Sequence, residues 1–254
     1  MNLTAEIFSN FLETPQLLTM VIVSILIGMA KTGVHGAGMM SVPILASVFG
    51  GQVSSGVMLP LLILADVAGV WYYHRHASWK HLKILFPWAA IGVIGGTMIG
   101  SSINDYTFKM VMSVTILVSV FIMILLEHYS ESIPEKKSFG YSMGVAAGFT
   151  SMVGNLANSV MAVYLLSVRL PKNIYIGTTA WFFLVINLFK LPFHVFVWNT
   201  IEQKILILDL MMLPFILVGA VTGIWIVKKF SDKHYRWFII LMTVVSAVFM
   251  LVKA

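Results

Sequence analysis

Six stretches of the chain are apolar over the length that a helix needs to cross a lipid bilayer. A crossing takes about 20 apolar residues, because the hydrocarbon layer is about 30 Å thick. The predicted spans are 54–73, 83–102, 106–126, 174–197, 205–227 and 234–252. We therefore predict an all-α polytopic membrane protein.

The composition argues against the common soluble functions. Hydrophobic residues make up 59% of the 254 residues and charged residues only 10%, with a mean hydropathy of +0.93. Soluble domains are about 45–50% apolar and about 25% charged, and a globule of this length cannot hide so much apolar surface. A soluble enzyme, a disordered regulator and a nucleic-acid-binding domain are therefore disfavoured.

The distribution of positive charge and the absence of cysteine limit which partners, cofactors and metals we expect. The formal net charge is +6, but the basic residues fall in short runs between apolar segments, which is typical of membrane loops. We expect the lipid bilayer and no nucleic acid as a partner. The absence of Cys excludes disulfides and thiolate metal sites, and no nucleotide-binding motif is present, so we expect neither a cofactor nor a metal.

Two further apolar regions, 16–49 and 139–168, are too long for one span and are interrupted near the middle. The interruptions read K-T-G-V-H-G-A-G at 31–38 and S-M-V-G-N-L-A-N at 151–158. We predict that each region forms two half-helices that meet at a break. The sequence leaves open whether each pair crosses fully or is re-entrant.

The distribution of Lys and Arg predicts the orientation. Eleven of the sixteen fall in four loops that share one side, three fall on the other side, and Lys31 and Lys190 lie inside apolar segments. Basic loops favour the cytoplasm. We predict a multi-pass protein of the cell membrane, in a bacterium the inner membrane, with both termini external and no signal peptide. The predicted cytoplasmic loops are 74–83, 127–138, 169–172 and 228–236.

The two halves of the chain share an order of features. At an offset of 120 residues Gly28 matches Gly148, and at an offset of 127 residues Pro87 matches Pro214 and Gly92 matches Gly219. An odd number of segments per half would invert the second half relative to the first. We predict two inverted repeats, each with a broken helix pair and three long helices, a plan that recurs in secondary transporters. The predicted domains are 1–126 and 139–254, joined by a cytoplasmic linker at 127–138.

This duplicated plan and two motifs resemble a known family. The motifs are G-M-A-K-T-G-V-H-G-A-G-M-M-S-V-P at 28–43 and W-F-F-L-V-I-N-L-F-K-L-P at 181–192. The chain is similar over most of its length to the sulfite exporter TauE/SafE family, also described as the four-toluene-sulfonate uptake permeases. The resemblance implies two related helical bundles and transport of sulfite, organosulfonates or other small anions.

The first break supplies candidate anion ligands. Glycines leave backbone N–H groups free at the start of a helix, where the partial positive charge favours an anion. Lys31 adds a full charge, although a lysine can also reach out to the membrane surface. His35 is a second candidate, or a core residue. The candidates here are Lys31, Gly33, His35, Gly36 and Gly38.

The second break supplies neutral hydrogen-bonding groups. Ser151, Asn155 and Asn158 could bind sulfonate oxygens. Asn and Ser are also good N-caps, so capping without a ligand is an equal alternative.

Three polar residues share one face of a long apolar segment. Asn187, Lys190 and His194 are three and four residues apart, and Asp66 occupies the matching place in the first half. Asn187 and Lys190 are candidate substrate ligands. Asp66 and His194 are candidates for coupling transport to protons or sodium, and Asp66 could instead pair with a lysine. Asp209 is interpreted as a partner of a helix dipole.

The leading hypothesis is an ion-coupled secondary transporter that exports a small oxyanion, sulfite or an organosulfonate, bound between the two breaks. A passive anion channel is the alternative. An intramembrane enzyme fits less well, because no H-E-x-x-H or G-x-S-x-G motif occurs. A cation transporter would rest on Asp66 alone.

Overall fold

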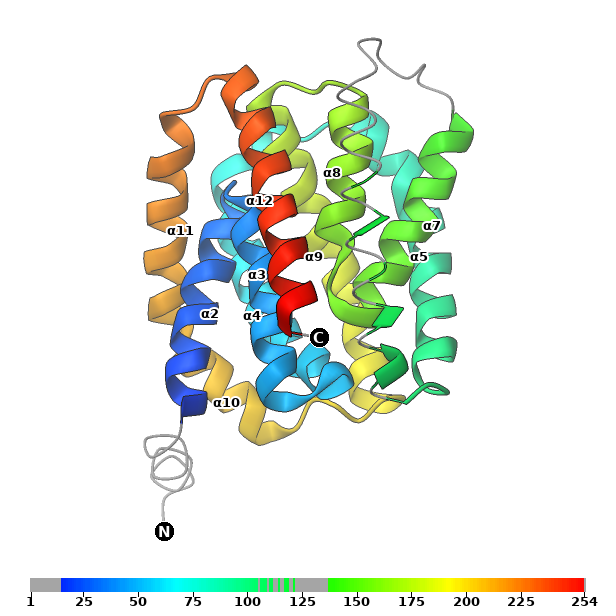
Figure 1. Ribbon diagram of the computed structural model, residues 1–254. Helices are drawn as coiled ribbons and strands as arrows, with labels where there is room; N and C mark the ends of the chain where they lie inside the picture. Colours follow the sequence, from blue (N-terminus) through cyan, green and yellow to red (C-terminus); the bar gives the residue numbers. More distant parts are fainter. Residues whose placement is uncertain are drawn as a thin grey trace.

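The computed structural model describes residues 15–104, 106–108, 110–111, 114, 117–118, 121 and 137–253. These residues form a bundle of helices that run between two ends (Figure 1), and no strand occurs among them. The helices are α2 (Pro15–Lys31), α3 (His35–Phe49), α4 (Gly51–Tyr73), α5 (Trp79–Gly100), α7 (Lys137–Gly154), α8 (Ala157–Ser167), α9 (Lys172–Phe196), α10 (Gln203–Met211), α11 (Leu213–Lys228) and α12 (Asp232–Lys253).

Four predicted spans agree with helices to within a few residues. They are α4, α5, α9 and α12. The predicted span at 205–227 is bent rather than straight, because α10 and α11 meet at an angle of 48°. Pro214 lies in the first turn of α11 and has no N–H to continue the hydrogen-bond ladder of α10. The predicted span 106–126 and the linker 127–136 lie mostly or wholly outside the described residues.

Both interrupted regions form a pair of helices, with breaks shorter than predicted. Only Thr32–Val34 separate α2 from α3, and only Asn155 and Leu156 separate α7 from α8. Each break contains a residue in the left-handed region, Gly33 at φ +123° and Asn155 at φ +57°. Glycine adopts that region without steric cost, and asparagine is the side chain that enters it most readily after glycine. A single left-handed residue therefore turns each chain within two or three positions.

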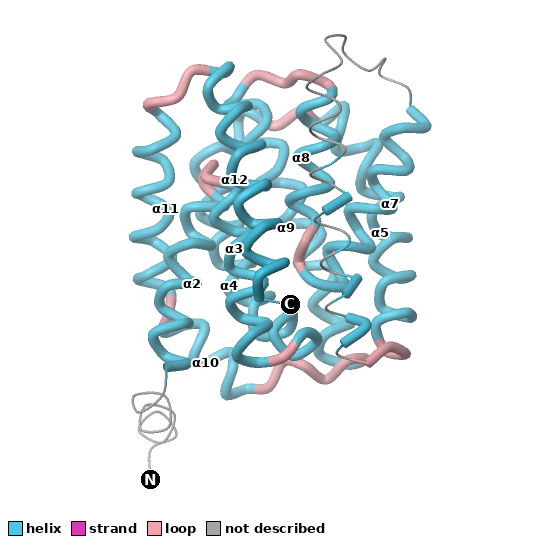
Figure 2. The backbone as a smooth tube through the Cα atoms, in the orientation of Figure 1, coloured by secondary structure: helices cyan, strands magenta, loops and turns pink. Residues whose placement is uncertain are grey.

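Each broken pair begins and ends at the same end of the bundle. In Figure 1, α2 starts and α3 finishes at the lower end, whereas α7 starts and α8 finishes at the upper end. The connecting loops gather at these two ends (Figure 2). The pairs are therefore hairpins of short helices with their breaks inside the bundle.

Glycines allow the broken pairs to pack closely against α5 and α11. A Cβ at Gly28 would collide with the carbonyl oxygen of Ile216 in α11, and a Cβ at Gly148 would collide with that of Ala89 in α5. Backbones this close exclude any side chain at the contact, and small residues serve this purpose at membrane helix interfaces. The reciprocal contacts are Gly219 on Ile25 and Gly92 on Val145.

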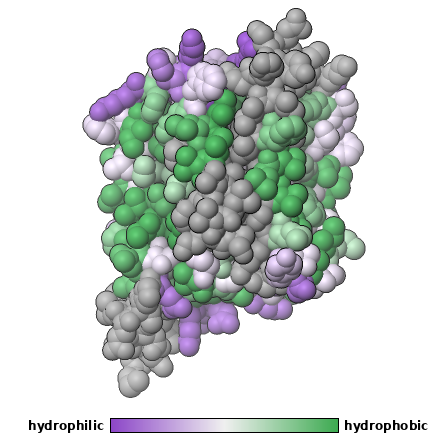
Figure 3. Space-filling view, viewed as in Figure 1, coloured by the Kyte–Doolittle hydropathy of each residue, from purple (hydrophilic) through white to green (hydrophobic). Residues whose placement is uncertain are grey.

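The surface carries an apolar belt between two polar ends (Figure 3). Among the described residues, α4, α5 and α9 are each long and apolar enough to cross a membrane, and α10 with α11 qualifies as one bent span. Large hydrophobic side chains face outward on these helices, including Trp71, Met98 and Val221. The belt has the character of a lipid-facing surface.

Candidate functional site

A buried ion pair connects the first break to α4. The Nζ of Lys31, the last residue of α2, lies 2.9 Å from Oδ1 of Asp66, and their side chains are 4% and 0% exposed. The same ammonium lies 4.1 Å from the centre of the Phe183 ring in α9. Lys31 therefore lies within protein, in contrast to the predicted alternative of reaching the membrane surface.

Asn187 links this ion pair to the second half of the chain. Its Nδ2 donates to Oδ2 of Asp66 at 2.6 Å, and its Oδ1 accepts from Nζ of Lys190 at 3.3 Å. The amide can serve both groups because Asn187 and Lys190 are three residues apart on α9 and project from the same face. One side chain thus bridges a carboxylate and a second ammonium.

Lys190 is held by the second break. Its Nζ donates to Oδ1 of Asn155 at 2.6 Å and to Oγ of Ser151 at 3.2 Å, and the residue is fully buried. Asn155 is itself fixed, because its Nδ2 donates to the backbone oxygen of Ser55 at 3.2 Å. The left-handed backbone of Asn155 therefore places an amide at the tip of the break, where it receives the ammonium.

These contacts form one network. Lys31 pairs with Asp66, Asn187 joins Asp66 to Lys190, and Lys190 donates to both Asn155 and Ser151. The three oxygens that accept from Lys190 belong to two amides and a hydroxyl, all neutral. Counted as ionised, Lys31 and Asp66 cancel, and Lys190 leaves the network with one positive charge. Within the described residues, Lys190 forms no salt bridge. An isolated buried charge is costly, so an arriving anion would be stabilised there.

The helices that follow the breaks start without side-chain caps. The N-cap residues are Val34 for α3 and Leu156 for α8, and neither makes a side-chain cap hydrogen bond. The interpretation of Ser151, Asn155 and Asn158 as caps is therefore wrong, since Ser151 and Asn155 contact Lys190 instead. Uncapped helix starts retain N–H donors that can receive an anion.

The starts of α3 and α8 lie against each other. A Cβ at Gly38 would lie 2.8 Å from Cβ of Ala30 and 3.4 Å from Nδ2 of Asn158, which is buried. Gly38 therefore permits close packing of α3 on α2 within the first broken pair and lies beside Asn158 of the second. Gly36 begins α3 with His35, and the side chain of His35 lies outside the described part of the structure.

Gly33 and His194 lie outside the network. Gly33 turns the first break, and its carbonyl accepts from the hydroxyl of Tyr235 at 2.6 Å. His194 lies one turn beyond Lys190 and is buried, with Nδ1 2.8 Å from Oγ1 of Thr200 and its ring edge-on to Trp198. The structure thus separates these two candidates from the six residues that it brings together.

The interpretation of Asp209 as a helix-dipole partner near a helix start is wrong. Asp209 lies in the last turn of α10, because the predicted long span divides at Met212. It is 1% exposed, and neither carboxylate oxygen has a hydrogen-bond partner among the described residues.

Sequence reasoning missed three residues that support the network. Ser55 holds Asn155, Phe183 lies against Lys31, and Tyr235 binds the first break. Ser55 gave a signal, since it is a polar residue beside Gly56 in an apolar span. Phe183 and Tyr235 gave none, because aromatic residues are frequent throughout the chain.

The family model for the sulfite exporter TauE/SafE matches residues 20–250. The chain belongs to this family. Membership makes it a membrane transporter of the sulfite or sulfonate type, and members of the family are transporters rather than enzymes. Comparison with curated proteins and with solved structures gives no match.

Proposed function

We propose that this protein is an ion-coupled secondary transporter that exports a small oxyanion, sulfite or an organosulfonate, bound at Lys190 between the two breaks. The observation that carries the proposal is a fully buried lysine whose Nζ is surrounded by three neutral oxygens and by no carboxylate among the described residues. Ser151, Asn155 and Asn187 fix the ammonium, and the uncapped starts of α3 and α8 supply N–H donors. Charge-assisted hydrogen bonds of this kind favour oxyanions.

The charge balance favours an anion over a cation. The carboxylate of Asp66, within the described residues the only acid in the network, is already neutralised by Lys31. A metal cation would face a net positive cluster, whereas an oxyanion would cancel the charge of Lys190.

Closure of the network favours a carrier over an open channel. Lys190 and Asn187 are 0% and 1% exposed. Cavities of about 350 Å³ and about 310 Å³ lie at opposite ends of the bundle, and neither is lined by a network residue. A carrier must pass through such an occluded state, in which its site is closed to both sides.

The proposal includes two inverted repeats, residues 1–126 and 139–254, that rock about the site. The glycine contacts support this symmetry. Gly28 meets Ile216 and Gly148 meets Ala89, and these two partners are separated by 127 residues, the offset between Pro87 and Pro214. In the reciprocal contacts the partners are Ile25 and Val145, which are separated by 120 residues, the offset between Gly28 and Gly148. The first broken pair therefore packs on α11 in the same way as the second packs on α5.

Asp66 is the proposed coupling group, because protonation would release its ion pair with Lys31 beside the anion site. His194 remains a second coupling candidate, one turn from Lys190. We place the end that carries the α8–α9 and α11–α12 loops in the cytoplasm of the cell, because it holds most of the basic loop residues.

Flux through liposomes tests the proposal. Purified protein should take up sulfite or short sulfonates with saturable kinetics, and internal substrate should accelerate that uptake, which does not occur in a channel. Lys190→Met should abolish this flux, whereas Lys204→Met, which removes an exposed lysine from another helix, should retain it. Flux of cations alone, or a non-saturating anion conductance, would contradict the proposal.

A further inference from the structure

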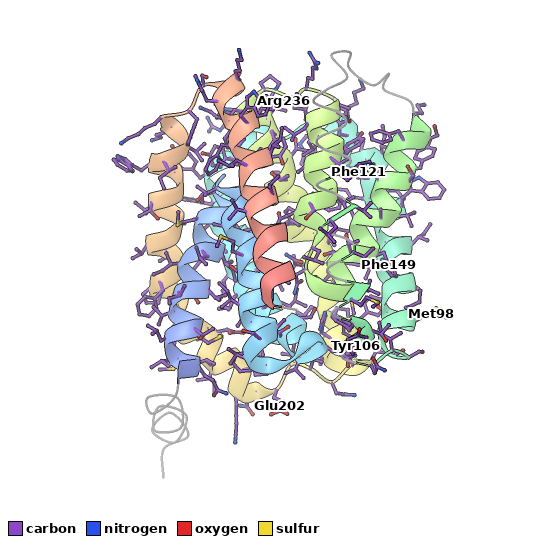
Figure 4. The ribbon with its side chains drawn as sticks, in the orientation of Figure 1. Met98, Tyr106, Phe121, Phe149, Glu202 and Arg236 are labelled. Atoms are coloured by element: carbon purple, nitrogen blue, oxygen red, sulfur yellow. The ribbon has the colours of Figure 1, made fainter. Side chains whose placement is uncertain are left out.

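The larger cavity, at the proposed cytoplasmic end, has a strongly basic lining. It has a volume of about 350 Å³ and lies between the α8–α9 loop, the start of α9 and the start of α12. Its ionisable lining residues, apart from two tyrosines, are Arg169, Lys172, Lys233, Arg236 and Asp232. Counted as ionised, they sum to three positive charges. Figure 4 shows Arg236 at this end of the bundle.

Backbone contacts hold part of this charge in place. The Nζ of Lys172 donates to the carbonyl oxygens of Val227 and Phe230 at the end of α11. Nη1 of Arg236 donates to the carbonyl oxygen of Leu166 at 3.0 Å. These bonds hold both cations at the wall of the cavity.

The cavity adjoins the first break. Tyr235 lines it, and the hydroxyl of the same residue donates to the carbonyl oxygen of Gly33. Gly33 is two residues from Lys31, the first member of the network. The buried side chain of Tyr235 therefore contacts both the cavity and the first break.

The cavity at the opposite end occupies equivalent positions but lacks this charge. It has a volume of about 310 Å³, and among its described lining residues are Phe49, Gln52 and Phe108, none of them ionisable. At the repeat offsets Phe49 matches Arg169, Gln52 matches Lys172 and Phe108 matches Tyr235.

The remaining matches preserve the contrast. Lys233 corresponds to Tyr106, which lies at the opposite end from Arg236 in Figure 4. Asp232 and Arg236 correspond to Asp105 and Lys109, which lie outside the described residues and whose formal charges cancel. The two cavities therefore lie at equivalent positions of the two halves, and their described lining residues differ in charge.

We infer that the basic cavity is a loading site, where a small oxyanion is captured before it passes Tyr235 to the network; this inference rests on the proposed function. A cleft lined by one sign of charge concentrates counter-ions and raises their rate of capture. The described lining of the opposite cavity has no such surplus, so we expect an anion released there to be recaptured less often. This difference gives the transporter a high affinity on one side and a low affinity on the other.

The double variant Arg169→Gln/Lys233→Gln tests the loading site, because both side chains are exposed and the change removes their charge but keeps a polar side chain. The matched control is Lys228→Gln/Lys229→Gln, which removes two positive charges from the same end of the bundle outside the cavity. Initial rates of sulfite transport would be measured in inside-out and right-side-out membrane vesicles at low and high ionic strength.

For sulfite offered to the basic cavity, the cavity variant should raise KM at least about fivefold at about 10 mM salt and leave the maximal rate within about twofold. The difference should vanish near 1 M salt, where the screening length falls to about 3 Å. KM at the opposite mouth, and KM of the control variant, should stay within about twofold of wild type. An unchanged KM at the basic mouth while Lys190→Met abolishes transport would overturn the loading site and leave the proposed function intact. A wild type that moves no oxyanion would overturn both.

The phosphate of a lipid headgroup has the same chemistry as a free oxyanion, so the test needs a lipid arm. The KM measurements would be repeated in liposomes of phosphatidylcholine alone and with added phosphatidylglycerol. The loading site predicts that the cavity variant raises KM in both. A rise confined to phosphatidylglycerol liposomes would mean that the cavity holds a lipid headgroup, and it would overturn the inference.

Discussion

The two broken helix pairs have similar backbones and different chemistry. At the first break, Lys31 is paired with the carboxylate of Asp66. At the second, the residue that matches Lys31 at the offset of 120 is Ser151, and both Ser151 and Asn187 hydrogen-bond to Lys190. The first half thus encloses a neutral ion pair, and the second half encloses a charge held by neutral oxygens.

This difference separates a paired charge, which stabilises the fold, from a charge that has no carboxylate partner among the described residues. Removal of one member of a buried ion pair leaves the other charge uncompensated and destabilises the fold, so stability alone explains why both residues are present. Lys190 has no such partner among the described residues, and the structure gives no stability argument for its charge. We interpret that surplus as the feature retained for the substrate.

The largest expected effect is on the ion pair. Lys31→Met should lower the free energy of unfolding by about 3–5 kcal/mol, because Asp66 would stay buried without its cation. Thermal unfolding in detergent measures the loss. The double variant Lys31→Met/Asp66→Asn should recover most of it, and failure to recover would show that Lys31 is retained for another reason.

The glycine contacts test whether the two halves share the same backbone packing despite their different polar residues. Gly28→Ala and Gly148→Ala should each destabilise by about 1–3 kcal/mol, because each added methyl group meets a carbonyl oxygen of the other half. Gly95→Ala is the control, since nothing lies within 4 Å of a Cβ there. A large cost at one position and none at the other would break the proposed symmetry.

Asn155→Gly removes the side-chain amide at the second break and keeps the backbone conformation there. Glycine accepts the left-handed conformation of this residue, so the variant removes only the hydrogen bonds to Lys190 and Ser55. A hydrogen bond to a charged group contributes about 1.5–3 kcal/mol, and thermal unfolding should show a loss of that size. Gly95→Ala again supplies the control, and an unchanged stability would mean that Lys190 does not depend on the break.

Asp209 offers the smallest effect and contrasts with Asp66. Its carboxylate is buried with no hydrogen-bond partner among the described residues. Asp209→Asn should therefore leave thermal stability unchanged or raise it by about 1 kcal/mol. A destabilisation of several kcal/mol would reveal a partner that holds this carboxylate.

Much of the fold could be predicted because apolar length and glycine positions are local signals. The broken regions 16–49 and 139–168 each form two helices, and α4, α5, α9 and α12 lie near their predicted bounds. The bend at Met212 was missed, because Pro214 within a long apolar run is also compatible with a single kinked span. The breaks were predicted too long, since Gly36 and Gly38 are helical despite their low propensity.

The six residues of the network were named as candidates from the sequence, but their pairings were not. Buried polar residues in apolar segments are visible in sequence, and six of them form one network. Whether Asp66 pairs with Lys31 or stands alone depends on how α2 and α4 pack, which no local pattern specifies. The roles of Lys31 and Lys190 therefore became distinct only in three dimensions.

The central claim is that the charge of Lys190 binds the oxyanion, and a direct titration tests it. Sulfite binding to purified protein would be measured by calorimetry for wild type, Lys190→Met and the charge-neutral Lys31→Met/Asp66→Asn variant. We predict that Lys190→Met weakens binding more than about tenfold, or about 1.4 kcal/mol, while the double variant stays within about threefold of wild type. Wild-type affinity in Lys190→Met, with loss in the double variant, would contradict the account and move the anion site to the first break.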